Sequence, residues 1–142
     1  MNKTNPGVNF FINLAKTQAV ASRRFDSHLG GLGLSEFIIL FYLNSSPEGK
    51  IRRVDLADKI GLTASGVTRL LLPMEKIGLV KRESTSDDAR VSYVSLTSSG
   101  KRKFSEGLER AEVFCEDTIP SAKTKNLEKI TAFLIELNSL IK

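Results

Sequence analysis

The sequence contains very little of the chemistry on which metal sites and most active sites depend. A single cysteine, Cys115, excludes an internal disulfide framework and a cysteine-cluster metal site. A single histidine, His28, excludes a metal site built from paired histidines, and the sequence shows no pairing of a nucleophile with a base around these two residues. We therefore expect no metal, no cofactor and no enzymatic activity.

Long apolar runs are also missing. The longest uninterrupted run covers residues 37–43, whereas a membrane-spanning helix needs about 20 apolar residues. The N-terminal residues show no signal-peptide cleavage pattern. These absences favour a cytoplasmic protein that does not associate with membranes, and 142 residues correspond to one domain.

Positive charge is distributed unevenly along the chain. The net charge is +5, but residues 50–103 contain 12 Lys and Arg against 6 Asp and Glu, so this segment alone carries +6. A basic segment is typical of proteins that bind a polyanion such as nucleic acid. The alternative is a solvated basic surface without a partner.

The first half of the chain is predicted to be helical. Apolar spacing indicates helices over residues 6–27, 36–44, 54–62 and 64–78. Gly61 and the capping residue Thr63 separate the last two, which is the helix-turn-helix pattern. Ser35 is the expected N-cap of the helix before them. Pro73 predicts a kink or an early end of the second short helix near Leu72.

A β-hairpin follows these helices. Short strands are predicted at 79–83 and 91–96, on either side of a polar turn at 84–90. Thr97 is the expected N-cap of a long helix that ends near Pro120, and a last amphipathic helix follows. The predicted fold class is therefore mainly α with a small β-hairpin wing.

One segment carries a specific motif. Residues 88–100 have the spacing D-x-R-x-x-x-V-x-L-T-x-x-G, which resembles the wing signature of the MarR family of bacterial transcription regulators at every fixed position. The segments LADKIGLTASGVTRLL and EKIGLVKR are similar to the family's helix-turn-helix and its exit into the wing. The resemblance implies one compact chain with a winged helix-turn-helix at 31–100 and dimerisation helices at 1–30 and 101–142.

The resemblance also implies a set of DNA-binding residues. In the recognition helix, residues 64–76, Arg69 can bond to guanine or to a phosphate. Arg90 would enter the minor groove, with Asp88 holding the wing in shape. The candidates are Arg52, Arg53, Thr63, Ser65, Gly66, Thr68, Arg69, Arg82, Ser84, Ser86, Asp88 and Arg90. The alternatives are that Thr63 only caps a helix and that the arginines are solvated or form surface salt bridges.

This sequence departs from the family at one capping position. Arg52 stands where the family often has Ser or Thr before the first helix of the helix-turn-helix, and Arg53 follows it. The change weakens the cap and adds two cations beside the edge expected to face DNA, where phosphate contacts set register.

The terminal helices carry more apolar surface than a monomer needs, and the resemblance assigns it to a dimer interface; the alternative is an intrachain core. The interface candidates are Phe10, Phe11, Leu14, Leu127, Ile130, Leu134, Leu137 and Ile141. The family's ligands are small and often aromatic, and the candidate cleft residues are His28, Phe37, Phe41 and Tyr42. The phenylalanines also suit an ordinary core. Cys115 lies on an apolar helix stripe and is expected to be inert, with redox sensing as the alternative.

The functional hypothesis is a homodimeric, sequence-specific transcription regulator. It would act as a repressor that binds a palindromic operator in double-stranded DNA and is modulated by a small aromatic ligand. The alternatives are a winged-helix module that binds another protein without recognising DNA, and a redox-responsive regulator that uses Cys115.

Overall fold

A computed structural model describes residues 3–85 and 88–141, and it describes their side chains except those of residues 85–91 and Ala122. In chain order the elements are α1 (Pro6–His28), α2 (Leu34–Ser45), β1 (Lys50–Arg52), α3 (Arg53–Ile60), α4 (Ala64–Lys76), β2 (Val80–Thr85), β3 (Asp88–Leu96), α5 (Ser98–Thr118), the 3-10 turn η1 (Ser121–Lys123) and α6 (Thr124–Leu140). The predicted fold class, mainly α with a small sheet, is confirmed.

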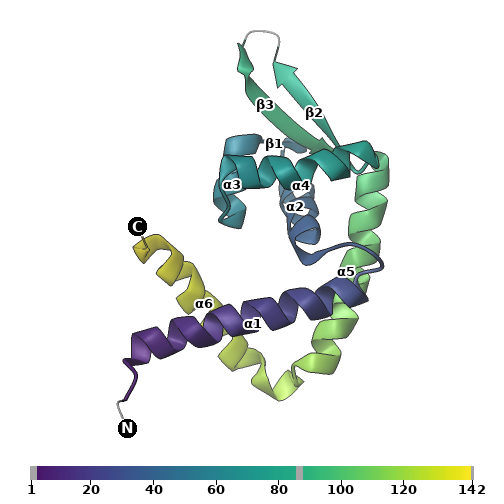
Figure 1. The fold of residues 1–142 in the computed structure, drawn as a ribbon. Coiled ribbons are helices and arrows are strands. Elements are labelled where there is room, and N and C mark those ends of the chain that lie inside the picture. Colours follow the sequence, from purple (N-terminus) through teal and green to yellow (C-terminus); the bar gives the residue numbers. More distant parts are fainter. Residues whose placement is uncertain (1–2, 86–87, 142) are drawn as a thin grey trace.

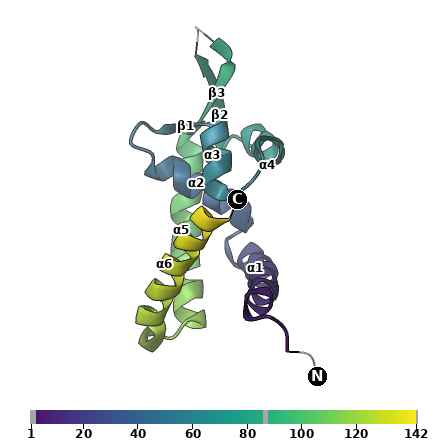
Figure 2. The same cartoon turned by 90° about the vertical axis from the view of Figure 1, so that its left-hand side faces the viewer.

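The elements form two parts that α5 connects. One part, called the head here, consists of α2, α3, α4 and the three strands, and its β2–β3 hairpin projects away from the helices (Figures 1 and 2). The other part, called the base, consists of α1, the second half of α5 and α6. Because α5 begins beside the hairpin and ends in the base, one helix links the wing to the terminal helices.

The sheet has one strand more than the sequence predicted. Its antiparallel order is β1-β3-β2, and the buried Ile51 of β1 lies opposite Val94 of β3. A three-residue strand is too short to show an apolar alternation, so the sequence did not reveal it. The two strands of the hairpin are also longer than predicted, because β2 extends to Thr85 and β3 starts at Asp88. The predicted turn at 84–90 is therefore wrong for most of its length, since backbone pairing extends beyond the apolar residues.

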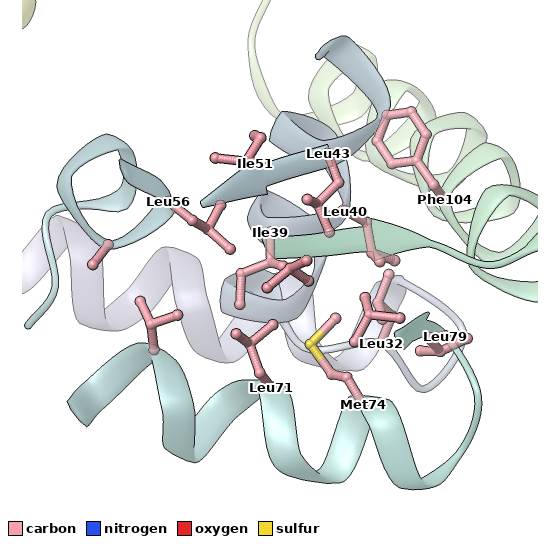
Figure 3. Close-up of a cluster of buried hydrophobic side chains, with 14 of the residues drawn as sticks. Leu32, Ile39, Leu40, Leu43, Ile51, Leu56, Leu71, Met74, Leu79 and Phe104 are labelled. Carbon is pink, nitrogen blue, oxygen red and sulfur yellow. The ribbon is translucent and has the colours of Figure 1, made fainter. Parts of the chain in front are cut away.

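The core lies where α2, α3, α4 and the sheet meet the first half of α5 (Figure 3). Its least exposed large side chains are Leu29, Leu32, Ile39, Leu40, Leu43, Leu56, Val67, Met74 and Val94. The buried residues of α4 are Val67, Leu71 and Met74, and the burial of this face fixes the recognition helix on the head.

The turn of the helix-turn-helix has the predicted chemistry. Gly61 ends α3 with φ of 72°, and the amide of Leu62 donates to the carbonyl of Ala57 at 3.0 Å. Thr63 then caps α4, because its hydroxyl oxygen accepts from the amide of Gly66 at 3.1 Å. These two caps set the point at which the recognition helix begins.

Thr97 and Gly100 join the wing to α5. The Thr97 hydroxyl oxygen accepts from the Gly100 amide at 3.0 Å and lies within hydrogen-bond distance of the carbonyl oxygens of Gly78 and Leu79. A Cβ on Gly100 would overlap the Leu79 carbonyl. The T-x-x-G spacing therefore brings the start of α5 against the turn between α4 and β2.

The predicted N-cap of α2 is wrong. The helix begins at Leu34, one residue before Ser35, and the capping position is Gly33. The carboxylate of Asp26 in α1 accepts a hydrogen bond from the Leu34 amide at 2.8 Å. Asp26 reaches across the glycine-rich turn, and a local cap pattern does not show a partner eight residues away.

Pro73 does not end α4. The helix continues from Ala64 to Lys76 through the proline, so of the predicted kink or early end near Leu72 the early end is wrong. Leu71 and Met74, on either side of Pro73, are both buried in the core. Their packing outweighs the backbone hydrogen bond that a proline removes.

Cys115 is exposed, so the expectation that its apolar stripe places it in the core is wrong. Its stripe on α5 includes Phe104 and Ala111, which are buried, but Ala111 is the last buried residue of the helix. The stripe leaves the core at the point where α5 enters the base. Among the described residues, no helix combines the length and apolarity needed to cross a membrane.

Candidate nucleic-acid interface

The outer face of α4 presents polar and basic side chains. Ser65 and Arg69 are exposed, and Lys76 is exposed further along the helix. Leu72 lies among them with 48% of its surface exposed, opposite the inner face that packs on the core. Leu72 was not among the predicted DNA-binding residues. This face can donate hydrogen bonds and offer one apolar contact to a ligand surface.

The first turn of α4 is organised by its cap. The Thr63 hydroxyl oxygen lies 3.2 Å from the Ser65 hydroxyl oxygen and accepts from the Gly66 amide. A Cβ on Gly66 would lie 3.2 Å from the Thr63 hydroxyl oxygen, so the glycine makes room for the cap. Thr63 therefore caps α4, and its contact with DNA stays a prediction.

Arg53 and Thr68 contact each other across the two helices. Arg53 Nη1 donates to Thr68 Oγ1 at 2.8 Å, and Thr68 Oγ1 donates to the Ala64 carbonyl at 3.0 Å. Both residues are half-buried. The buried Nε of Arg53 has no hydrogen-bond partner among the described residues. The two side chains predicted to contact DNA are thus engaged with each other.

Arg52, the last residue of β1, points to the following helix α3. Its Nε and Nη2 donate to the two carboxylate oxygens of Asp55 at 2.9 and 3.3 Å, and both side chains are about half exposed. This hydrogen bond raises the pKa of Arg52 and lowers the pKa of Asp55 below its usual 3.8. Arg52 makes no side-chain capping bond at the N-terminus of α3. The expected weakness of this cap is confirmed, and the guanidinium remains open to solvent.

Arg82 lies at the base of the wing and pairs with the recognition helix. Its Nε and Nη2 lie 3.2 and 3.1 Å from Glu75 Oε2 in α4. The Nζ of Lys81, the preceding residue of β2, lies 3.6 Å from Oε1 of Glu83. Ser84 is exposed near the end of β2. Arg82 thus ties the wing to α4.

The rest of the predicted wing set falls at the tip. Ser86 lies outside the described residues. Asp88 and Arg90 belong to β3, which places them on a strand and not in the predicted turn, and their side chains are outside the described part. Their assignment to the minor groove stays a prediction.

The positive excess falls on the head. The segment 50–103, with a net charge of +6, runs from the first residue of β1 into the early turns of α5. It includes all of α3, α4 and the wing, and Figure 1 shows these elements together at one end of the molecule. The basic end of the protein is therefore the end that carries the outer face of α4.

The four predicted cleft residues do not form one group, because His28 lies apart from the other three. The His28 ring packs against Phe114, with 5.0 Å between ring centroids, whereas Phe37 and Phe41 pack against Phe104. Tyr42 packs against Phe41 and the Lys59 ammonium group. An open groove of about 600 Å³ lies beside His28 and is lined otherwise by Glu106, Glu109, Arg110, Val113, Phe114, Asp117 and Thr118. These α5 residues were not predicted from the sequence, because their contact with His28 depends on how α1 crosses α5.

The terminal helices leave their apolar residues largely uncovered. None of the residues of α1 and α6, all of which are described, is buried. Ile130 is 54% exposed, and Phe11, Leu127 and Ile141 are also exposed. The remaining interface candidates, Phe10, Leu14, Leu134 and Leu137, are half-buried. Phe10 and Phe133 contact edge to face at 5.7 Å. None of the eight interface candidates belongs to the buried core of the chain.

A capped helix-turn-helix followed by an antiparallel wing defines the class of winged helix-turn-helix proteins. Residues 30–91 match the profile of the MarR family. The HTH-type transcriptional regulator YfiV of Bacillus subtilis is 34% identical over 73 residues, which are 51% of this chain and 44% of YfiV. The repressor YetL of the same organism is 26% identical over 103 residues, 71% of this chain and 62% of YetL. The winged-helix region of this chain is similar to the MarR family, and the chain spans about half the length of these relatives.

Solved structures extend the fold similarity to nearly the whole chain. The regulator BldR of Sulfolobus solfataricus superposes with a TM-score of 0.81 at 24% identity, covering 99% of this chain and all of BldR. An organohalide-sensing regulator bound to 2,4-dichlorophenol superposes with a TM-score of 0.83 at 19% identity, and the match covers 96% of this chain and 82% of that regulator. The regulator MosR of M. tuberculosis, in complex with DNA, superposes with a TM-score of 0.75 at 22% identity, and the match covers 91% of this chain and 95% of MosR. The terminal helices thus belong to the shared fold.

Proposed function

We propose that this protein is a homodimeric transcription regulator that binds a specific site in double-stranded DNA. The outer face of α4 supports this function most directly, because Ser65 and Arg69 are exposed there on the basic head. The first turns of a recognition helix meet base edges in the major groove, and arginine pairs well with guanine. Ser84, Asp88 and Arg90 follow on the wing, where an arginine can enter the minor groove beside the same site.

The proposal includes a second copy of the chain as partner. Exposed apolar residues on α1 and α6, such as Phe11 and Ile130, would be covered by the same helices of another protomer. A two-fold dimer would place its recognition helices about 34–36 Å apart, which matches two half-sites of a palindrome. The proposed division of the chain is therefore a dimerisation region at 1–30 and 101–142 around the DNA-binding region.

Repression and control by a small ligand complete the proposal. One relative is a repressor by name, and one structural neighbour holds a dichlorophenol. The groove beside His28 lies along residues 106–118 of α5, next to the end of α1, and Phe114 offers an aromatic wall for a small aromatic compound. A ligand that binds better to the DNA-free arrangement would release the operator in proportion to that difference in affinity.

Binding to DNA from the upstream region of the protein's own gene tests the function. We expect affinity well above that for a scrambled duplex of the same length and composition, and a steep loss with salt. Arg69→Ala should lower specific binding by about 1–3 kcal/mol, while the dimer remains intact in sedimentation experiments. Equal affinity for both duplexes would indicate the alternative, a winged-helix module that binds another protein.

A further inference from the structure

We propose that Arg53 is a positioning residue that sets the recognition helix through Thr68, and that it is not a phosphate contact. The inference rests on the proposed DNA-binding function. It also separates the roles of two adjacent arginines: Arg52 lies in solvent with Asp55, whereas Arg53 turns inward to the other helix of the pair.

Two hydrogen bonds form a continuous connection between the helices. Arg53 is the first residue of α3, and its Nη1 reaches Thr68 Oγ1, fifteen residues away on α4, at 2.8 Å. Guanidinium groups only donate, so Thr68 accepts this bond and uses its own hydrogen to donate to the Ala64 carbonyl at 3.0 Å. The connection therefore runs from the start of α3 to the first residue of α4.

The burial of Arg53 agrees with a role inside the protein. The residue is half-buried, and its buried Nε has no partner among the described residues. An unpaired buried donor costs free energy, so this placement needs a compensating interaction, and the bond to Thr68 supplies one. The bond to Thr68 holds the Arg53 guanidinium against α4. Arg52, at 48% side-chain exposure, can reach a phosphate from where it lies.

The position of Thr68 explains why the connection affects sequence reading. Ser65 and Arg69 lie three residues before and one residue after it on α4. A hydrogen bond to a base edge requires its donor to be held within about 0.5 Å and 10–20° of the productive geometry. Contacts with the phosphate backbone carry no sequence information. Loosening the first turns of α4 should thus reduce discrimination more than general affinity for DNA.

Four variants separate positioning from direct contact: Arg53→Met, Thr68→Val, their combination, and the control Arg52→Met. The probes are a duplex selected by the wild-type protein from a random-sequence pool, and its scrambled version, each measured over a salt series. We expect Arg53→Met and Thr68→Val each to reduce the ratio of the two affinities about tenfold. In the double variant this ratio of affinities should fall by no more than in either single variant. The salt slope on the scrambled duplex should stay unchanged for Arg53→Met and fall by about 1 for Arg52→Met.

A measurement without DNA checks the same connection. Amide hydrogen exchange at Thr68 and Arg69 should accelerate in Arg53→Met and in Thr68→Val, and should keep its wild-type rate in Arg52→Met and Thr68→Ser. Thr68→Ser retains the hydroxyl, so it should also retain discrimination. If Arg53→Met does not fold, the pair Thr68→Val and Thr68→Ser carries the test.

Three results would overturn the proposal. The first is an equal loss on both duplexes with a smaller salt slope in Arg53→Met, which identifies a phosphate contact. The second is additive losses in the double variant, which show that Thr68 reads DNA independently of Arg53. The third is unchanged amide exchange in Arg53→Met and Thr68→Val. Failure of the wild-type protein to select any duplex would instead refute the DNA-binding function itself.

Discussion

Arg82 and Glu75 hold the wing and the recognition helix together: two guanidinium nitrogens of Arg82 on β2 lie within 3.2 Å of a single carboxylate oxygen of Glu75 on α4. Both side chains are partly exposed, so the pair contributes under about 1 kcal/mol to stability. Its main consequence is electrostatic, because the carboxylate neutralises an arginine beside the proposed DNA-binding face.

Removing this carboxylate should increase affinity for DNA. Glu75→Gln frees Arg82 and deletes a negative charge, so binding to a scrambled duplex should strengthen and its salt slope should increase by about 1. Glu112→Gln removes the same charge from an exposed position in the second half of α5, in the base, and should leave both quantities unchanged. If the two variants behave alike, the effect reports net charge and not the release of Arg82.

Gly100→Ala should destabilise the protein. The added Cβ overlaps the backbone carbonyl of Leu79, which cannot move without disturbing the turn between α4 and β2. We expect a loss of about 1–3 kcal/mol in the free energy of unfolding, measured by urea denaturation. Lys101→Ala, one residue further along α5 and exposed, is the control and should change stability by under about 0.5 kcal/mol. A loss of similar size in both variants would show that the steric contact is not the cause.

Asp26→Ala should weaken the start of α2. It removes the acceptor of the Leu34 amide, and the loss of an N-cap costs about 0.5–2 kcal/mol. Ser35→Ala changes the residue that the local pattern predicted as the cap, and it should be nearly neutral. Thermal and urea unfolding of both variants decide between the two residues. The reverse order of stabilities would contradict the cap from α1.

The pair of Arg52 and Asp55 should make stability depend on acid pH. The pKa of Asp55 is lower in the folded protein than its usual 3.8, so the unfolded chain binds the proton more readily. The stabilisation is therefore complete above pH of about 4 and is lost as pH falls through the folded-state pKa. Arg52→Gln should return the pKa of Asp55 towards 3.8, as followed by NMR of the side-chain carboxyl group. An unchanged pKa in that variant would rule out Arg52 as its main cause.

Local signals in the sequence were sufficient for the helix-turn-helix and for the base of the wing. Thr63 caps α4 and Gly61 ends α3 because both act within a few residues along the chain. Thr97 and Gly100 were also recognised from their spacing, although only the structure shows that they contact the carbonyl group of Leu79. Short-range capping chemistry is therefore readable without a fold.

Contacts between distant segments could not be predicted in the same way. The sequence assigned Arg53 and Thr68 to DNA separately, whereas the structure pairs them across α3 and α4. The cap from Asp26 likewise depends on how α1 crosses the glycine-rich turn. The grouping of His28 with Phe114, and not with Phe37, follows from the packing of α1 on α5. In each case the partner is chosen by tertiary geometry, which periodicity does not encode.

The close contact of Gly100 with Leu79 has a mechanical consequence. It fixes one end of α5 to the turn that carries both the recognition helix and the wing, while the other end of α5 lies in the base. A helix of 21 residues is about 30 Å long at about 1.5 Å per residue. A tilt of about 5° at the base would therefore displace the head by roughly 2.6 Å over that length. Such a displacement is close to the length of one hydrogen bond, so a small rotation at the far end can decide whether a donor reaches its acceptor.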